Sequence, residues 1–251
     1  MKKKTTALLL AALLVLTVCG CGGSREAPAP AAAPTAVPAA EPTAEPTAAP
    51  TPEPTEEPAP EPTPEPSSEL SGRWEGESYV NEFLGMKYAL PQGWQHLDDE
   101  QLLEMSGLTA DMVKDEEISQ ALAEAAEEGR VFYALFASSA DSRQTFNLGF
   151  EKLNAVQTLA VTEDAYIAVA EPQLKTALES MGLTDYASER VNVTLGGREM
   201  PALRLDGKIN GMDIHELVAV CKQNGYMATF SFSSAAEDNL DAMTEGWSAL
   251  D

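Results

Sequence analysis

Apolar and polar positions alternate through most of the last third of the chain, which is the pattern of half-buried β-strands. Three pairs of residues that readily adopt positive φ angles divide this region: Gly196-Gly197, Asn210-Gly211 and Asn224-Gly225. One face of the first strand carries Val191, Val193 and Leu195, and one face of the last carries Tyr226, Ala228, Phe230 and Phe232. The pattern therefore predicts a four-stranded antiparallel meander.

Further strands are predicted in the first half of the domain. The segment GRVFYALFA (129–137) is apolar on both faces, as a central strand would be, and TFNLGFEKL (145–153) alternates in a way that lets it pair with this strand. Upstream, YVNEFLGMKYALPQGW (79–94) predicts an extended segment that stops at Pro91 and Gly93.

Helical patterns lie between and after these strands. Thr162, followed by two acidic residues, predicts the start of a helix that continues to Met181-Gly182, and we expect Pro172 to kink or split it. Asp98 or Asp99 is expected to cap a short helix.

Two more helices are predicted by apolar residues that recur at helical spacing. The first ends at Gly129 and carries Ile118, Leu122 and Ala126. The second is a final helix capped by Ser233 or Ser234, and its core stripe is Leu240, Met243, Trp247 and Leu250. Together these elements predict an α+β fold, a largely antiparallel sheet flanked by helices.

The N-terminus has a different pattern. Three lysines, Lys2 to Lys4, precede an uncharged apolar run from Ala7 to Val18, which is too short to span a bilayer but suits a signal peptide. The run ends at Val18-Cys19-Gly20-Cys21, which resembles the bacterial lipoprotein signal, in which a small residue precedes the modified cysteine. Gly20 fits that position and Val18 does not. We therefore expect residues 1–20 to be the signal peptide and Cys21 to be the acylated N-terminus.

Other uses of this cysteine pair fit the sequence less well. A zinc site would need two further ligands, and the next forty-odd residues contain no Cys or His. An ordinary cleaved signal peptide is the remaining alternative. After processing, only Cys221 accompanies Cys21, so no disulfide framework is expected.

Residues 21–69 form a segment of unusual composition. Of the 17 prolines in the chain, 14 lie between residues 28 and 66, among Ala, Thr and Glu. Such a segment buries too little apolar surface to offset its conformational entropy, so we expect a disordered spacer with a bias toward extended polyproline II. At about 3.1 Å per residue its contour approaches roughly 140 Å. That length could lift a domain from a membrane into a thick, Gram-positive-type wall.

Charge narrows the partners of the remaining domain, residues 70–251. The whole chain has a net charge of −24, and this domain contains 31 acidic and 12 basic residues. The balance argues against nucleic-acid binding, which depends on Lys and Arg, and against adsorption to anionic lipid headgroups. The simplest meaning of the acidic surface is solubility. We expect a monomeric domain that is held at the membrane only through Cys21, with an envelope protein as a candidate partner.

Few residues of the domain suggest a catalytic, metal-binding or phosphate-binding role. His96 lies near Asp98, Asp99 and Glu100, but these acids stand where a helix cap and first turn need them. Cys221 is expected to be a small apolar residue of a buried strand; His215 shares its face, but about 20 Å away at strand rise. Gly196-Gly197 is expected to be a turn and not a phosphate loop. Nucleophile-elbow, zinc-protease and phosphate-loop motifs are absent, so we expect no cofactor, no metal and no catalytic residue.

One stretch carries a family resemblance. GRWEGESYVNEFLGMKYALPQGW, with Asn81, Gly85 and Tyr88 before Leu90-Pro91-Gln92-Gly93-Trp94, resembles the opening strand of small bacterial lipoproteins with a PsbP-like fold. The resemblance implies an α/β/α sandwich over residues 72–250. Named relatives are binding or assembly subunits more than enzymes, so it implies a scaffold without a reaction, and it transfers no functional residue.

The sequence thus predicts a lipid-anchored extracytoplasmic protein whose domain is a non-catalytic binding or interaction module. The alternative is a cell-envelope hydrolase or transferase that uses scattered carboxylates such as Asp98, Glu116 and Glu117. A pair of partly buried carboxylates with raised pKa values in a concave pocket would favour the enzyme. A shallow apolar patch without titratable groups would favour the binding module.

Overall fold

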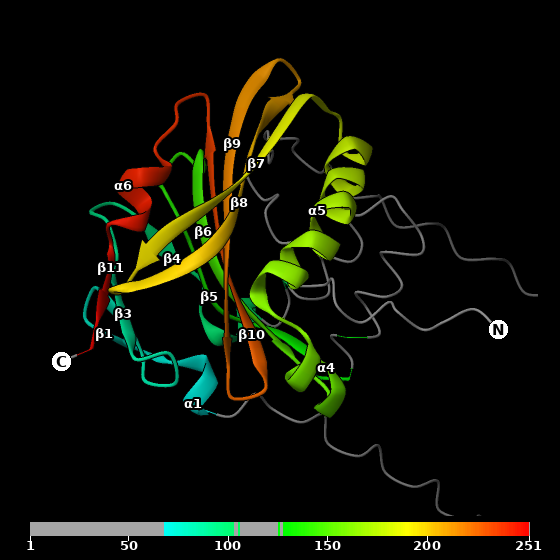
Figure 1. The fold of residues 1–251 in the computed structure, drawn as a ribbon. Helices are drawn as coiled ribbons and strands as arrows, with labels where there is room; N and C mark the ends of the chain where they lie inside the picture. The colour runs from blue at the N-terminus through cyan, green and yellow to red at the C-terminus, as the bar shows by residue number, and fades with distance from the viewer. Residues whose placement is uncertain (1–67, 103–104, 106–124, 126–127, 251) are drawn as a thin grey trace, which may run out of the picture. The chain divides into compact units, whose positions relative to one another are not determined.

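The computed structural model describes residues 68–102, 105, 125 and 128–250. Two antiparallel sheets dominate this part of the chain (Figure 1). The larger sheet has the strand order β4-β5-β6-β10-β9-β8-β7. In chain order its strands are β4 (Gln95–His96), β5 (Val131–Ser138), β6 (Gln144–Lys152), β7 (Leu183–Leu195), β8 (Arg198–Ile209), β9 (Met212–Gln223) and β10 (Tyr226–Ala235).

A smaller sheet has the order β1-β2-β3-β11. Its strands are β1 (Arg73–Glu75), β2 (Ser78–Asn81), β3 (Met86–Ala89) and β11 (Trp247–Ala249). The helices are α1 (Ser68–Ser71), α4 (Ala155–Ala160), α5 (Glu163–Ser180) and α6 (Leu240–Thr244). The predicted α+β class, with antiparallel sheet flanked by helices, is confirmed.

The predicted meander is present as β7-β8-β9-β10. All six residues of the three turns, Gly196-Gly197, Asn210-Gly211 and Asn224-Gly225, have positive φ. This conformation matches the twist of the strands that the turns connect. The register of β9 on β10 runs without interruption from Gln223↔Tyr226 to Ile214↔Ala235.

One face of the larger sheet packs against the smaller sheet and forms the main core. The predicted inward residues of β7 and β10 lie on this face, which confirms their alternation. Aromatic rings fill the space between the sheets, with Phe146 4.9 Å from Tyr88 and Phe230 5.1 Å from Trp247, measured between ring centroids. Close ring packing of this kind contributes beyond the area it buries.

On the other face of the larger sheet, α5 packs over β7, β8 and β9 (Figure 1). Thr162 caps this helix, because its side chain accepts a hydrogen bond from Ala165 N at 3.2 Å. The predicted helix bounds are confirmed. Pro172 does not split α5, which continues through it, and the alternative that Pro172 kinks the helix stays a prediction. Pro172 and Ala168 are both exposed, so water can satisfy the carbonyl that proline leaves without a donor.

The prediction of a long final helix is wrong at both its start and its end. Ser233 and Ser234 lie inside β10 and cap nothing, and α6 is only five residues long. The chain then returns to extended form as β11, in which Trp247 pairs with Tyr88 of β3. Leu240, Met243 and Trp247 are buried as expected, but pairing with the open edge of β3 decides the backbone of the last residues.

The segment 79–94 also differs from its prediction. It is not one extended strand but the hairpin β2–β3, whose turn is closed by a hydrogen bond from Gly85 N to Glu82 O at 3.2 Å. The two apolar runs that follow are confirmed as the paired strands β5 and β6, with β5 in the interior of the sheet. The predicted helix through Ile118, Leu122 and Ala126 lies outside the described residues apart from Ala125.

In the part of the chain that the structure describes, no helix is both long enough and apolar enough to cross a membrane.

Candidate functional site

Most residues singled out in the sequence have structural roles or lie outside the described residues. Cys21, Glu116 and Glu117 lie outside. Asp98 caps a helical turn: its carboxylate accepts from Gln101 N at 2.9 Å, while Gln101 Oε1 accepts from Asp98 N at 3.0 Å. The capping role expected for Asp98 is therefore confirmed. His96 stacks on Trp74, with ring centroids 3.9 Å apart.

Cys221 is buried in β9 among core residues. Burial raises the pKa of its thiol to about 11, which favours the unreactive thiol over the thiolate. The expectation of an apolar core role for Cys221 is confirmed.

Three polar residues for which the sequence predicted no shared site lie side by side on β8, β9 and β10. Asp206 is the register partner of His215, and His215 is the partner of Ser234. His215 Nδ1 lies 2.6 Å from Asp206 Oδ1. This order of acid, histidine and serine resembles a hydrolase triad, so the direction of the serine hydroxyl is decisive.

The serine of this row is not positioned as a nucleophile. Ser234 is fully buried, and its hydroxyl donates to the carbonyl of Glu237 at 2.6 Å. Arg204 contacts both Asp206 and Asp238, so the cluster holds the β10–α6 connection against β8. Burial is the largest single influence on the pKa of Asp238 and raises it, but the hydrogen bonds from Arg204 and the Leu240 N–H, together with the nearby positive charge of Arg204, outweigh burial and lower the pKa. These residues therefore form a structural network of charged and hydrogen-bonded groups and not a catalytic triad.

The sheet divides at Pro201. The β8–β9 ladder ends at Ala202↔Ala219, whereas the β7–β8 ladder continues to Leu195↔Arg198. Pro201 has no N–H with which to extend the ladder toward β9. Past this point β7 and β8 leave β9 and continue over the main core, where Gly196 lies against the side chain of Met86.

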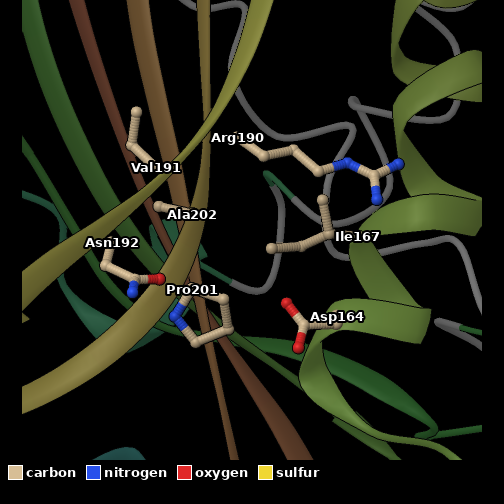
Figure 2. A pocket seen from close by; sticks show the side chains of 7 residues that line it. All are labelled: Asp164, Ile167, Arg190, Val191, Asn192, Pro201 and Ala202. Atoms are coloured by element: carbon tan, nitrogen blue, oxygen red, sulfur yellow. The ribbon is translucent and has the colours of Figure 1, made fainter.

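A hollow of about 170 Å³ lies at this division (Figure 2). Asp164 and Ile167 line it from α5, and the rest of its lining comes from β7 and β8: Arg190, Val191, Asn192, Pro201 and Ala202. Arg190 already binds the Glu171 carboxylate at 2.8 Å, and its charge is compensated there. The hollow thus contains one carboxylate and no pair of buried acids.

A second candidate is the α5-facing side of the larger sheet. On β10, three of the residues that alternate with the core aromatics are hydroxylic (Thr229, Ser231 and Ser233), and they are as deeply buried as those aromatics. Their register partners on β6 and β9 add further polar groups. We call this set the polar row: Thr145, Asn147, Glu216, Thr229, Ser231 and Ser233, each at most 2% exposed.

Several atoms of the polar row lack partners. Among the described residues, Thr229 Oγ1, Ser231 Oγ and Glu216 Oε2 are buried without a hydrogen bond. Among the described residues, the Glu216 carboxyl accepts one long hydrogen bond, of 3.5 Å, from the Ser233 hydroxyl. Native proteins pair nearly all buried polar groups, so a cluster of exceptions needs an explanation such as bound water or a ligand.

Two buried carboxyl groups border this face. Burial raises the pKa of Glu151 to about 7, and the Tyr166 hydroxyl donates to it at 2.8 Å. Burial also raises the pKa of Glu216 well above its ordinary range, against a smaller opposing effect of the Ser233 hydroxyl. The register partners of the two acids on β10 are Met227 and Ser233, six residues or about 20 Å apart. They cannot act together on one bond.

Within residues 68–102 and 128–250, no group of three or more His, Cys, Asp or Glu side chains converges as metal ligands would.

Comparison with known proteins gives no family. No family model matches the chain, and no curated protein matches it. Similar solved structures include PsbP (CyanoP) of Synechocystis sp. PCC 6803, at 17% identity and a TM-score of 0.39, covering 68% of this chain and 91% of that one. Another is LpqN of Mycobacterium tuberculosis, involved in cell envelope biogenesis, at 15% identity and a TM-score of 0.35, covering 65% and 82%.

These comparisons place a PsbP protein among the similar structures, in agreement with the resemblance in the opening segment of the domain.

Proposed function

We propose that this chain is a lipid-anchored extracytoplasmic protein, held in the membrane through Cys21, whose domain is a non-catalytic binding module. The signal-like N-terminus and the small residue before Cys21 support the anchor. The proline-rich segment supports a domain held away from the membrane surface.

The polar row is the observation that supports a binding role. A sheet face that only packs against helices would be expected to carry aliphatic residues, as the neighbouring part of this face does with Leu203, Leu205 and Val218. The polar row instead buries hydroxyl and carboxyl groups whose hydrogen-bonding capacity the described residues do not use. A bound polar molecule would recover the free energy that this arrangement costs.

The arrangement of acids argues against the hydrolase or transferase alternative. Glu151 and Glu216 are the described carboxyl groups whose pKa values burial raises, and they lie about 20 Å apart along the sheet. Asp98 is engaged in its helix cap. General acid–base catalysis needs groups within hydrogen-bond reach of one reacting centre.

The test is binding without turnover. The acylated full-length protein, solubilised in mild detergent, is screened by thermal shift against neutral sugars, polyols, amino acids and short peptides, and each stabilising compound is then incubated with the protein and analysed by mass spectrometry. We expect stabilisation with every compound recovered unchanged. Protein-dependent conversion of any of them would contradict the proposal.

A further inference from the structure

β7 is an edge strand of the larger sheet. In the part of the chain that the structure describes, β8 pairs with one side of β7 and no strand pairs with the other. The register with β8 is continuous from Ala187↔Asp206 to Leu195↔Arg198, a length of roughly 30 Å at strand rise. Residues 187–190 are exposed on both faces of the strand. The outer side of β7 is therefore a template on which another strand can pair.

The first residues of β7 are protected against such pairing. A β-bulge between Thr184 and Ala187 interrupts the register, and Asp185 within it has positive φ. Bulges bend a strand and are a common protection of sheet edges. From Ala187 to Leu195 the strand has no bulge and no proline, so this stretch can accept a partner strand.

The two faces of this edge differ in chemistry. Val191 and Val193 are half-buried against the main core, so part of each apolar side chain stays accessible. Ser188, Arg190 and Asn192 lie on the face that carries α5. The side chains of a strand added at β7 would alternate between these two faces. One set would cover the valines, and the other would lie beside α5.

The hollow at the division of the sheet lies beside this edge, because Arg190 and Asn192 of β7 line it. Asp164 lines it from α5, on the side that faces Pro201 (Figure 2). Among the ion pairs of the described residues none involves Asp164, whereas Arg190 is compensated by Glu171 at 2.8 Å. The uncompensated charge of the hollow is therefore a single carboxylate. A basic side chain from an added strand would meet an opposite charge there.

We propose that β7 binds an extended basic peptide segment of a partner protein by strand addition, with apolar residues over Val191 and Val193 and basic residues directed to the hollow and Asp164. In this mode of recognition backbone hydrogen bonds provide affinity, and the alternate side chains provide specificity. The inference goes beyond the proposed binding function, because this edge is separate from the polar row.

Charge and backbone chemistry favour such a partner over a segment of this chain. A second copy has the same net charge of −24, so two copies repel each other. The proline-rich segment has 14 prolines between residues 28 and 66, which lack the N–H groups that strand pairing needs, and its charged residues are all glutamates. Neither matches the carboxylate of the hollow as a basic peptide does.

The experiment uses the full-length acylated protein in nonionic detergent and a fluorescent synthetic peptide of alternating Lys and Val. Fluorescence anisotropy measures binding, and hydrogen exchange measures the protection of backbone amides. We expect the peptide to bind and to slow exchange within residues 187–195. A Glu-Val peptide of the same length should not bind, and salt should weaken the binding of the Lys-Val peptide.

Two methylated peptides distinguish strand addition from a purely electrostatic contact. A strand pairs with one neighbour through the N–H groups of alternate residues only. One peptide is N-methylated at every Lys and the other at every Val. We expect one of them to lose binding and the other to keep it, since only one side of the peptide faces β7.

A pair of matched variants tests the hollow. Asp164→Asn should weaken binding of the Lys-Val peptide about threefold, because an exposed ion pair contributes modestly to affinity. Asp241→Asn makes the same change at an exposed acid in the first turn of α6 and should leave binding unchanged.

Each of the following results would overturn the inference. If the Lys-Val peptide does not bind, strand addition fails, and small-molecule binding keeps its own test. Equal binding of the two methylated peptides would exclude backbone pairing. Equal binding by the Asp164 and Asp241 variants would exclude the hollow. A dimer in sedimentation whose β7 amides are protected without peptide would assign the edge to a second copy. Cleavage of the peptide would contradict the proposed non-catalytic function as well.

Discussion

The Glu163 side chain accepts a hydrogen bond of 3.1 Å from the backbone N–H of Lys222, across 59 residues of sequence. This N–H points toward the side of β9 where β8 would pair if the ladder continued past Pro201. Glu163 begins α5, and the Lys222 ammonium donates in turn to the carbonyl of Val161 at 2.7 Å. The start of α5 thus provides hydrogen-bond partners for Lys222 of β9 at the point where β8 separates from that strand.

Removal of this carboxylate should destabilise the domain. Glu163→Ala leaves a partly buried backbone N–H without its acceptor and removes a favourable charge from the helix N-terminus, so we expect a loss of about 1–2 kcal/mol in the free energy of unfolding. Chemical denaturation measures this loss. Asp164→Ala, which alters the same helix turn without a contact to Lys222, should cost less than half as much; equal losses would mean that only the helix dipole matters.

The raised pKa of Glu151 should make stability depend on pH. Between its ordinary value of 4.5 and about 7, the unfolded chain ionises this carboxyl while the folded protein keeps it protonated, so the free energy of unfolding falls as pH rises. The full effect is up to about 3 kcal/mol. The stabilising contribution is complete below the unfolded pKa and is lost as pH rises through the folded one.

Glu151→Gln tests this dependence, because the amide cannot ionise and still accepts from Tyr166. Melting temperatures at about pH 5 and pH 8 should show the variant gaining on the wild type at the higher pH. Glu171→Gln is the opposite control. Hydrogen bonds from Arg190 and Ser188 lower the pKa of Glu171, so this variant should show no such gain. A constant difference between wild type and Glu151→Gln at both pH values would refute the assignment.

The two glycines of the β7–β8 turn should respond differently to alanine. Both have positive φ, but a Cβ on Gly196 would lie 2.8 Å from Met86 Cγ, whereas a Cβ on Gly197 would meet nothing within 4 Å. Gly197→Ala should therefore cost about 1–2 kcal/mol for backbone strain, and Gly196→Ala distinctly more because Met86 must also move. Equal losses in denaturant titrations would show that the hairpin does not press on the smaller sheet.

Cys21→Ser should release the protein from the membrane fraction and abolish fatty-acid labelling. Each buried acyl methylene contributes about 0.8 kcal/mol to membrane binding, and more than one chain makes the anchor durable. Cys19→Ser should keep both the label and the membrane location. Fatty-acid label that persists in the Cys21 variant and disappears in the Cys19 variant would show that Cys19, and not Cys21, is the attachment site.

Local chemistry made much of this fold predictable. The three hairpin turns follow from residue pairs that tolerate positive φ, and the start of α5 follows from Thr162 and the two acids after it. The apolar faces of β7 and β10 follow from alternation. Each of these signals lies within a few residues of the structure that it specifies, so a local sequence pattern is enough to predict that structure.

The burial of the polar row is a feature that such local signals could not predict. Thr229, Ser231 and Ser233 alternate with core residues as they would on a strand with one face in water, and the pattern is the same whether the polar face is solvated or buried. Sequence reasoning recognised the strand and its apolar face but had no means of recognising that the hydroxyl face is also covered. A run of hydroxylic residues at alternate positions is the only signal that could have raised the question.

The sequence by itself determined the three hairpin turns, the helix caps at Asp98 and Thr162, and the apolar faces of β7 and β10, because each depends on neighbours along the chain. Only the tertiary structure decided that residues 247–249 form a strand, that the sheet divides at Pro201, and that Asp206 meets His215. It also decided that Glu151 and Glu216 stand too far apart for joint catalysis. These features depend on which strands pair and in which register, and pairing is set by the packing of segments that lie far apart in the sequence.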